Sequence, residues 1–184
     1  MSNIIAIDSY QPQEEDKFFF DTNIWMFLYC PMGNYKEAIV KKYDGFLKKA
    51  IGIKSSIFIS SLVLSEFFNA YTRLEFNILK GKEPLDFKKD FRGTDDYQRL
   101  VINIKTIVKT KILKLAKRLN DNFSNINIDE LFEDIEQSDF NDKYYQFLAI
   151  TENIMIVTDD SDFASTKKTT VPILTANYKL LKGS

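Results

Sequence analysis

The sequence predicts an α/β fold built on a buried parallel sheet. Three short runs, at residues 17–20, 57–59 and 154–157, are almost entirely apolar, which is typical of strands covered on both faces. Stretches with helical periodicity separate these runs, as β-α-β crossovers require. Because ligands of such sheets bind at the carboxyl ends of the strands, the polar residues that follow each strand are the first candidates for function.

The first half of the chain alternates regularly between predicted strands and helices. The strand that ends at Phe20 is followed by an amphipathic helix over residues 35–51. The second strand stops at Ser60, which is suited to cap the next helix, over residues 64–78. Glycine, proline and mixed charges then predict a loop over residues 81–95.

The second half continues the alternation with less regular spacing. Its predicted elements are a long basic helix (97–119), an Asn-rich irregular segment (120–127), a short acidic helix (129–136), an apolar helix (140–150), a strand (154–157) and a weak strand (171–174). Ser138 and Asp139 are candidate caps of the apolar helix. Pro172 suits an edge position for the last strand, because proline cannot donate a backbone hydrogen bond.

Composition excludes several classes of function. The 184 residues suggest one domain, and a hydrophobic content of 45% is enough for a full core. The single cysteine, Cys30, excludes a disulfide framework and a cysteine-based zinc site. The chain has no histidine, which removes Ser-His-Asp triads, histidine-ligated metals and histidine general bases. Catalysis would therefore depend on carboxylates, lysines, hydroxyl groups or a bound cofactor.

The charges are unevenly distributed although the net charge is only −1. Residues 99–118 hold seven Lys or Arg and no acid, and residues 129–142 hold seven Asp or Glu and no base. The simplest interpretation is two solvated helix faces of opposite sign. The N-terminus lacks the pattern of a secretion signal, and no apolar run approaches the ~18 residues of a membrane helix. We therefore expect a cytoplasmic protein.

Acidic residues gather where the predicted strands end. They are Asp21 after the first strand, Glu66 in the helix after the second, Asp142 in the first turn of the helix before the third, and Asp159, Asp160 and Asp162 after the third. Two carboxylates ~4 Å apart repel by roughly 4 kcal/mol at an effective dielectric constant of ~20. Such a cluster must take up protons or bind a cation, and an all-oxygen site suits Mg²⁺ or Mn²⁺.

Each acid also has a simpler explanation when it is taken alone. Asp21 could begin a turn, Asp139 could cap a helix, and Asp142 could complement a helix dipole. Asp159 and Asp160 could form a turn or cap a short helix. The case for a shared site depends on the joint placement of these residues after successive strands.

Four segments in order make the chain resemble the PIN-domain ribonucleases. They are Phe18–Trp25 with the first acid, Ile59–Phe67 with a helix-borne Glu, Asp142–Ala149 with an Asp that opens an apolar helix, and Ile156–Phe163, where a strand ends in Thr followed by acids. The resemblance covers nearly the whole chain and depends on the order of the motifs. It implies a three-layer α/β/α sandwich with a four- or five-stranded parallel sheet.

The resemblance also implies a site and an activity, the metal-dependent hydrolysis of RNA phosphodiesters. Asp21, Glu66 and Asp142 match the three core acids that hold Mg²⁺ or Mn²⁺, and Asp160 matches the fourth, with Asp162 as its alternative. Thr22, Asn23 and Thr158 match supporting polar positions. The basic helix would attract phosphates through Lys105, Lys109, Lys114 and Lys117.

Many stand-alone bacterial members of that family are VapC-type toxins of toxin–antitoxin pairs; these toxins are usually dimers and are inhibited by a small antitoxin. The resemblance therefore implies RNA as substrate, a possible antitoxin partner, a possible homodimer and no membrane partner. We expect a single domain over residues 1–184. The segment at 81–128 is an insertion relative to the shorter typical toxin.

Other interpretations remain open at this stage. An RNA-processing nuclease outside any toxin pair, or a catalytically silent PIN-like binding module, would share the same motifs. A haloacid-dehalogenase-like phosphatase would need a second Asp and a Thr or Val where Asn23 and Trp25 stand. A receiver domain would need an acidic pair after the first strand, which this chain lacks.

Overall fold

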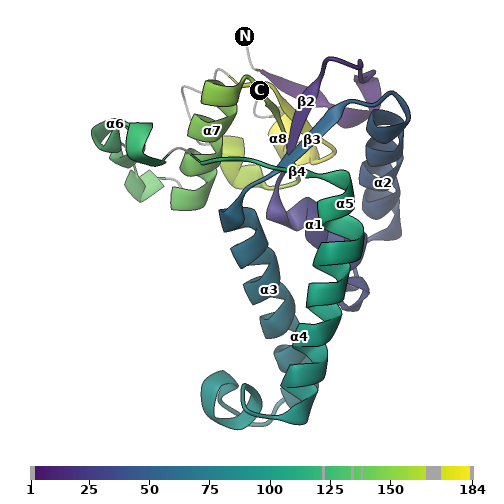
Figure 1. Cartoon of the computed structure of the whole chain (residues 1–184), viewed down its shortest axis with the longest axis vertical. Helices are drawn as coiled ribbons and strands as arrows, with labels where there is room; N and C mark the ends of the chain where they lie inside the picture. Colours follow the sequence, from purple (N-terminus) through teal and green to yellow (C-terminus); the bar gives the residue numbers. More distant parts are fainter. Residues whose placement is uncertain (1–2, 122, 134, 138, 165–170, 183–184) are drawn as a thin grey trace.

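The computed structural model describes residues 3–121, 123–133, 135–137, 139–164 and 171–182. Among these residues, six parallel strands form one sheet with the order β1-β6-β5-β2-β3-β4 (Figure 1). Along the chain the strands are β1 (Ile4–Ala6), β2 (Lys17–Phe20), β3 (Ser56–Ile59), β4 (Lys117–Arg118), β5 (Met155–Val157) and β6 (Ile173–Thr175). The predicted parallel sheet is confirmed, with six strands in place of four or five.

Helices flank the sheet, as the predicted α/β/α sandwich requires (Figure 1). Those described are α1 (Thr22–Tyr29), α2 (Glu37–Gly52), α3 (Ser61–Lys80), α4 (Asp95–Ile107), α5 (Leu113–Leu115), α6 (Ile128–Phe132), α7 (Phe140–Glu152) and α8 (Tyr178–Lys182). None of the helices in the described part of the chain is both long and apolar enough to cross a membrane.

The centre of the sheet explains why its strands are apolar on both faces. Phe18, Phe19 and Phe20 of β2 are almost completely buried, and Phe19 lies opposite Phe58 of β3 and Ile156 of β5. A strand with helices above and below it has no solvent-facing side, so the alternation of polar and apolar residues is lost. The core therefore fixes the register in which β2, β3 and β5 end side by side.

The two strands that the sequence analysis missed are the two edges. β1 has three residues. β4 has two residues, Lys117 and Arg118, which are both exposed and charged. The charged pair of β4 gives no apolar run that could predict a strand, whereas β1 is a short apolar run that the sequence analysis passed over. The edge position predicted for Pro172 is wrong, because β6 lies between β1 and β5. Pro172 precedes the ladder, where its carbonyl accepts a hydrogen bond from Ile156 N at 3.0 Å.

A helical hairpin extends from the carboxyl end of the sheet (Figure 1). It consists of α3 and the returning segment made of α4, a π-helical stretch at Val108–Ile112, and α5. The predicted loop at 81–95 contains a second π-helical stretch, Phe87–Phe91, whose first turn is capped by the Asp86 side chain. The predicted helix over 97–119 is too long at its end, because Lys117 and Arg118 pair with β3 instead.

The caps at the other helices follow the sequence closely. Ser60 caps α3 by accepting a hydrogen bond from Val63 N at 3.2 Å. Asp139 caps α7 by accepting one from Asn141 N at 2.8 Å, while the alternative cap, Ser138, lies outside the described residues. The acidic helix predicted at 129–136 is shorter than expected, because α6 ends at Phe132.

Candidate functional site

The ends of β2 and β5 and the starts of α3 and α7 meet at one edge of the sheet, the edge from which the hairpin projects (Figure 1). Adjacent parallel strands place their carboxyl ends together, and the helix that follows each strand begins there. The four acids Asp21, Glu66, Asp142 and Asp160, called the acid site below, are carried by these segments.

Asp21 lies at the N-terminus of α1 and is only 5% exposed. Its carboxylate accepts hydrogen bonds from Thr22 N at 2.5 Å, Asn23 Nδ2 at 2.5 Å and Thr158 Oγ1 at 2.7 Å. Burial raises the pKa of Asp21 to about 7, and the nearby Glu66 and Asp160 carboxylates add to that rise, although the hydrogen bonds from Thr158 and Thr22 oppose it. The carboxylate is thus held in place by three donors, and no Lys or Arg in the described part of the chain forms an ion pair with it.

Glu66 lies in the second turn of α3 and is held from two other helices. Thr22 Oγ1, from α1, donates to its Oε2 at 2.6 Å. From α7, Tyr145 donates its hydroxyl proton to the same oxygen, and Asn141 Nδ2 donates to Oε1. Burial, followed by the hydrogen bond to Glu66, raises the pKa of the Tyr145 phenol above its usual range.

Asp142 lies in the first turn of α7 and is 8% exposed. Burial raises the pKa of its carboxyl group to about 8, and the negative charges of Asp21, Asp160, Asp139 and Asp162 contribute in that order. The charge of Asp21 acts on Asp142 although the two residues are separated by 121 positions in the sequence. This is the convergence that the strand order predicts.

The three acids after β5 point in different directions. Asp159 turns toward α2, where the Tyr43 hydroxyl donates to its Oδ1 at 2.6 Å. The charge of Asp160 contributes to the raised pKa of both Asp21 and Asp142. Asp162 acts on Asp142, and its backbone N–H donates to Asp160 Oδ1 at 2.9 Å. Asp160 thus acts on both buried carboxyl groups, and Asp162 acts on that of Asp142.

The donor set of the acid site fits a hard divalent cation. Carboxylates that raise one another's pKa need a cation or protons, and oxygen ligands suit Mg²⁺ or Mn²⁺. Within the described residues, no Lys or Arg forms an ion pair with any of the four acids. No three of their carboxylates, over the same residues, are close enough together to hold one ion by themselves. Water molecules would therefore complete the coordination, as is usual for Mg²⁺.

The sequence analysis missed residues that are hydrogen-bonded to the acids but lie far from them in the sequence. Asn141 and Tyr145 stand four positions apart on one face of α7, and Tyr43 reaches the loop after β5 from α2. The i, i+4 spacing of Asn141 and Tyr145 was visible in the sequence. Its target, Glu66, was not, because the contact joins elements 75 and 79 positions apart.

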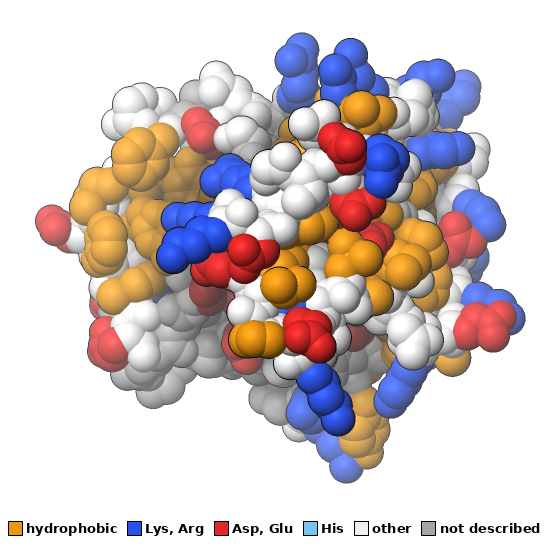
Figure 2. All heavy atoms as spheres, turned by 90° about the horizontal axis from the view of Figure 1, so that it is seen from below, with side chains coloured by type: hydrophobic (Ala, Val, Ile, Leu, Met, Phe, Trp, Pro, Cys, Tyr) orange, Lys and Arg blue, Asp and Glu red, His pale blue; other side chains and the backbone are white. Residues whose placement is uncertain are grey.

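The lysines proposed for RNA binding follow one another along the returning segment of the hairpin and its exit, and are called the basic strip below. Lys105 is on α4, Lys109 on the π-helical stretch, Lys114 on α5 and Lys117 on β4, and all four are exposed. Lys117 Nζ donates to Ser56 Oγ at 3.0 Å. Figure 2, which views the molecule from below, shows many Lys and Arg side chains projecting from this end of the protein.

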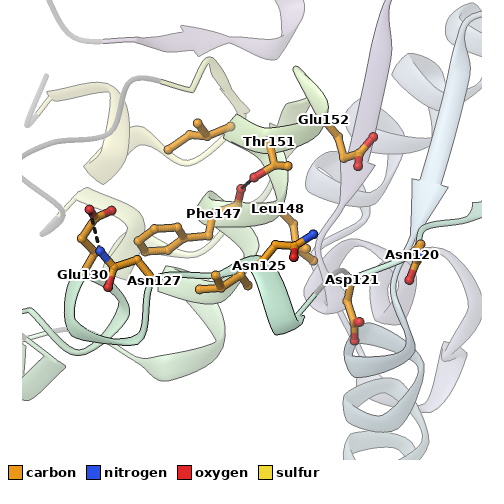
Figure 3. A pocket seen from close by; sticks show the side chains of 11 residues that line it. Asn120, Asp121, Asn125, Asn127, Glu130, Phe147, Leu148, Thr151 and Glu152 are labelled. Carbon is orange, nitrogen blue, oxygen red and sulfur yellow. Dashed lines mark hydrogen bonds between the residues drawn. The ribbon is translucent and has the colours of Figure 1, made fainter.

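A cavity of about 270 Å³ lies beside the second half of α7, between that helix and the segment that leads into α6 (Figure 3). Its lining includes Asn120, Asn125, Asn127, Phe147 and Thr151, and none of the four acids of the acid site. Within the lining, Asn127 Nδ2 donates to Glu130 Oε1 at 3.0 Å. The cavity is therefore separate from the acid site.

Comparisons with known proteins identify the family of the chain. A family model described as "PIN domain" matches residues 18–169. The crystal structure of PAE2754 from Pyrobaculum aerophilum is similar over 97% of this chain and 95% of that chain, at 18% identity and a TM-score of 0.47. No curated protein matched the chain. PIN domains are generally nucleases and typically use divalent metals. Since the family model spans most of the sequence, this chain belongs to the PIN-domain family.

Proposed function

We propose that the protein is an endoribonuclease that depends on Mg²⁺ or Mn²⁺ and hydrolyses RNA phosphodiesters. The observation that carries the proposal is the burial of two carboxylates, Asp21 and Asp142, at one edge of the sheet, where they are 5% and 8% exposed; this burial raises their pKa values. Such a pair is costly to ionise unless a cation binds. Membership of the PIN-domain family, which overturns the dehalogenase-like and receiver-like alternatives, supports a nuclease.

Each residue of the acid site has a role in this proposal. Asp21, Glu66, Asp142 and Asp160 hold the metal, and Asp162 is the alternative to Asp160. Thr22, Asn23 and Thr158 fix the Asp21 carboxylate through three hydrogen bonds. When bound, Mg²⁺ or Mn²⁺ activates water and neutralises charge on the phosphodiester. The chain has no histidine, so the acid site must work through carboxylates, hydroxyl groups and amides alone.

The basic strip supports a polyanionic substrate. Lys105, Lys109, Lys114 and Lys117 are exposed point charges that attract phosphates without reading bases. A nuclease that grips RNA in this way would bind more weakly as salt increases. In this proposal the lysines of the basic strip attract the phosphates of the RNA, and the carboxylates of the acid site take part in the hydrolysis of its phosphodiesters.

The biological role that we propose is the toxin of a type II toxin–antitoxin pair, acting as a homodimer and inhibited by a small antitoxin. Growth arrest on expression, relieved by a neighbouring reading frame, would support that role. Growth without arrest would favour an RNA-processing nuclease. A catalytically silent binding module is the outcome if the protein binds RNA and never cuts it.

Incubation with total RNA tests the activity directly. The protein is expected to cut RNA with Mg²⁺ or Mn²⁺ and to stop when EDTA is added. Asp21→Asn should abolish cleavage while the circular dichroism spectrum stays unchanged, because the substitution keeps the size of the side chain and removes a charge. Asp129→Asn, at an exposed acid on α6, is the matched control and should cut normally. Undiminished cleavage by Asp21→Asn would overturn the assignment.

A further inference from the structure

We infer that Tyr145, together with Asn141, is a positioning residue that leaves Glu66 a single oxygen, Oε1, with which to face the metal. The inference rests on the metal site proposed above and names residues of α7 that build it. The observation behind it is the set of hydrogen bonds that ends on the Glu66 carboxylate.

The acceptor capacity of Glu66 is almost used up by the protein itself. Each oxygen of an ionised carboxylate can accept about two hydrogen bonds or ligand bonds. Oε2 accepts from both Thr22 Oγ1 and Tyr145 OH, so its capacity is filled. Among the donors of the described residues, Oε1 accepts a hydrogen bond from Asn141 Nδ2 alone, so one direction remains. A metal, or a water bound to one, can reach Glu66 only there.

The Tyr145 hydroxyl is held in place by its ring. Tyr145 is 1% exposed, and its ring packs against Phe19 of β2 with the centroids 5.0 Å apart. The side chain therefore cannot turn away from Glu66 without opening the core between α7 and the sheet. Asn141, one turn earlier on the same face of α7, reaches the other oxygen of the same carboxylate.

Helix α7 thus supplies one acid of the acid site, Asp142, and also orients a second one, Glu66. Asp142 follows Asn141 directly, so α7 carries a proposed ligand beside the residue that fixes Glu66 on α3. Groups that orient metal-binding side chains typically change metal affinity by ~10- to 100-fold when they are removed. Tyr145 should therefore be measurable in metal binding as well as in stability.

The test compares two tyrosines on the same helix. Tyr145→Phe removes the hydroxyl that meets Glu66, and Tyr144→Phe removes a hydroxyl that interacts with Asp121 and not with the acid site. Mn²⁺ affinity is measured by calorimetry on the full chain without RNA. We expect Tyr145→Phe to weaken Mn²⁺ binding ~10-fold and Tyr144→Phe to leave it unchanged. Equal Mn²⁺ affinities of the two variants would overturn the inference.

A second variant and a kinetic readout guard against a purely structural effect. Asn141→Ala keeps the backbone hydrogen bond to Asp139, so α7 stays capped, and it should also weaken Mn²⁺ binding several-fold. In RNA cleavage, both variants should need more metal for half-maximal rate and regain most of kcat at saturating Mn²⁺. A lowered kcat with unchanged metal dependence would contradict a positioning role.

The outcomes also separate this inference from the proposed function. If the unmodified protein binds Mn²⁺, loses binding in Tyr145→Phe and yet cuts no RNA, the nuclease assignment fails and the role of Tyr145 stands. If RNA is cut but Tyr145→Phe matches the unmodified protein in Mn²⁺ affinity, only the inference fails. If the unmodified protein binds no Mn²⁺, the inference is overturned as well.

Discussion

Replacing Asp142 by Asn is expected to stabilise the metal-free protein at pH 8, and much less at pH 5. Burial and the charges of Asp21, Asp160, Asp139 and Asp162 raise the pKa of Asp142 from 3.8 to about 8. The folded protein therefore holds this proton more tightly than the unfolded chain does. The stabilisation that follows is complete below pH 4 and is lost as the pH rises through 8.

The size of this change in stability follows from the difference between the pKa of Asp142 in the unfolded and in the folded protein. Between the unfolded and the folded pKa, each pH unit changes the free energy of unfolding by about 1.4 kcal/mol for one group. From pH 5 to pH 8 the Asp142 carboxyl thus removes up to about 4 kcal/mol from the stability of the metal-free protein. At about 2–4 °C per kcal/mol for a chain of this size, Asp142→Asn should raise Tm at pH 8 by roughly 10 °C.

Thermal unfolding in EDTA, followed by circular dichroism from pH 5 to pH 8.5, measures this effect. The Tm of the unmodified protein should fall as the pH rises, and the Tm of Asp142→Asn should fall less. Asp129→Asn, which changes an exposed acid on α6, is the control and should follow the unmodified protein. Added Mn²⁺ should raise the Tm of the unmodified protein, and the increase should be largest at high pH. An Asp142→Asn protein that melts at or below the unmodified Tm at pH 8 would refute the reasoning.

Two further predictions concern the hairpin and the loop after β5. Replacing both Lys105 and Lys109 by Gln should reduce the slope of log K against log [salt] for binding of single-stranded RNA by about 0.7 per lost phosphate contact. Binding is measured in the Asp21→Asn background. An unchanged slope would mean that the phosphate contacts are made by other residues. Lys48→Gln on α2 is the control. Tyr43→Phe should cost about 2 kcal/mol in urea unfolding, because the Asp159 carboxylate and Ala176 N–H each lose a partner; a loss below about 0.5 kcal/mol would contradict this account.

Much of the fold could be predicted because its signals are local. The runs around β2, β3 and β5 are apolar on both faces, and Ser60 and Asp139 cap the helices that they precede. The edge strand β4 could not be predicted in the same way. Lys117 and Arg118 form β4 only because β3 offers its free edge to them, and that pairing outweighs the helical periodicity of the preceding residues.

In the acid site, too, some features follow from the sequence and others depend on the tertiary structure. The sequence by itself determined which residue types end the strands, and from the order of the strands it follows that Asp21, Glu66 and Asp142 share an edge. The tertiary structure alone decided how each carboxylate is held. It turns Asp159 toward Tyr43, and it brings Tyr145 to Glu66 across 79 positions. The physical reason is that strand and helix patterns depend on neighbouring residues, whereas a hydrogen bond between distant helices depends on how the whole core packs.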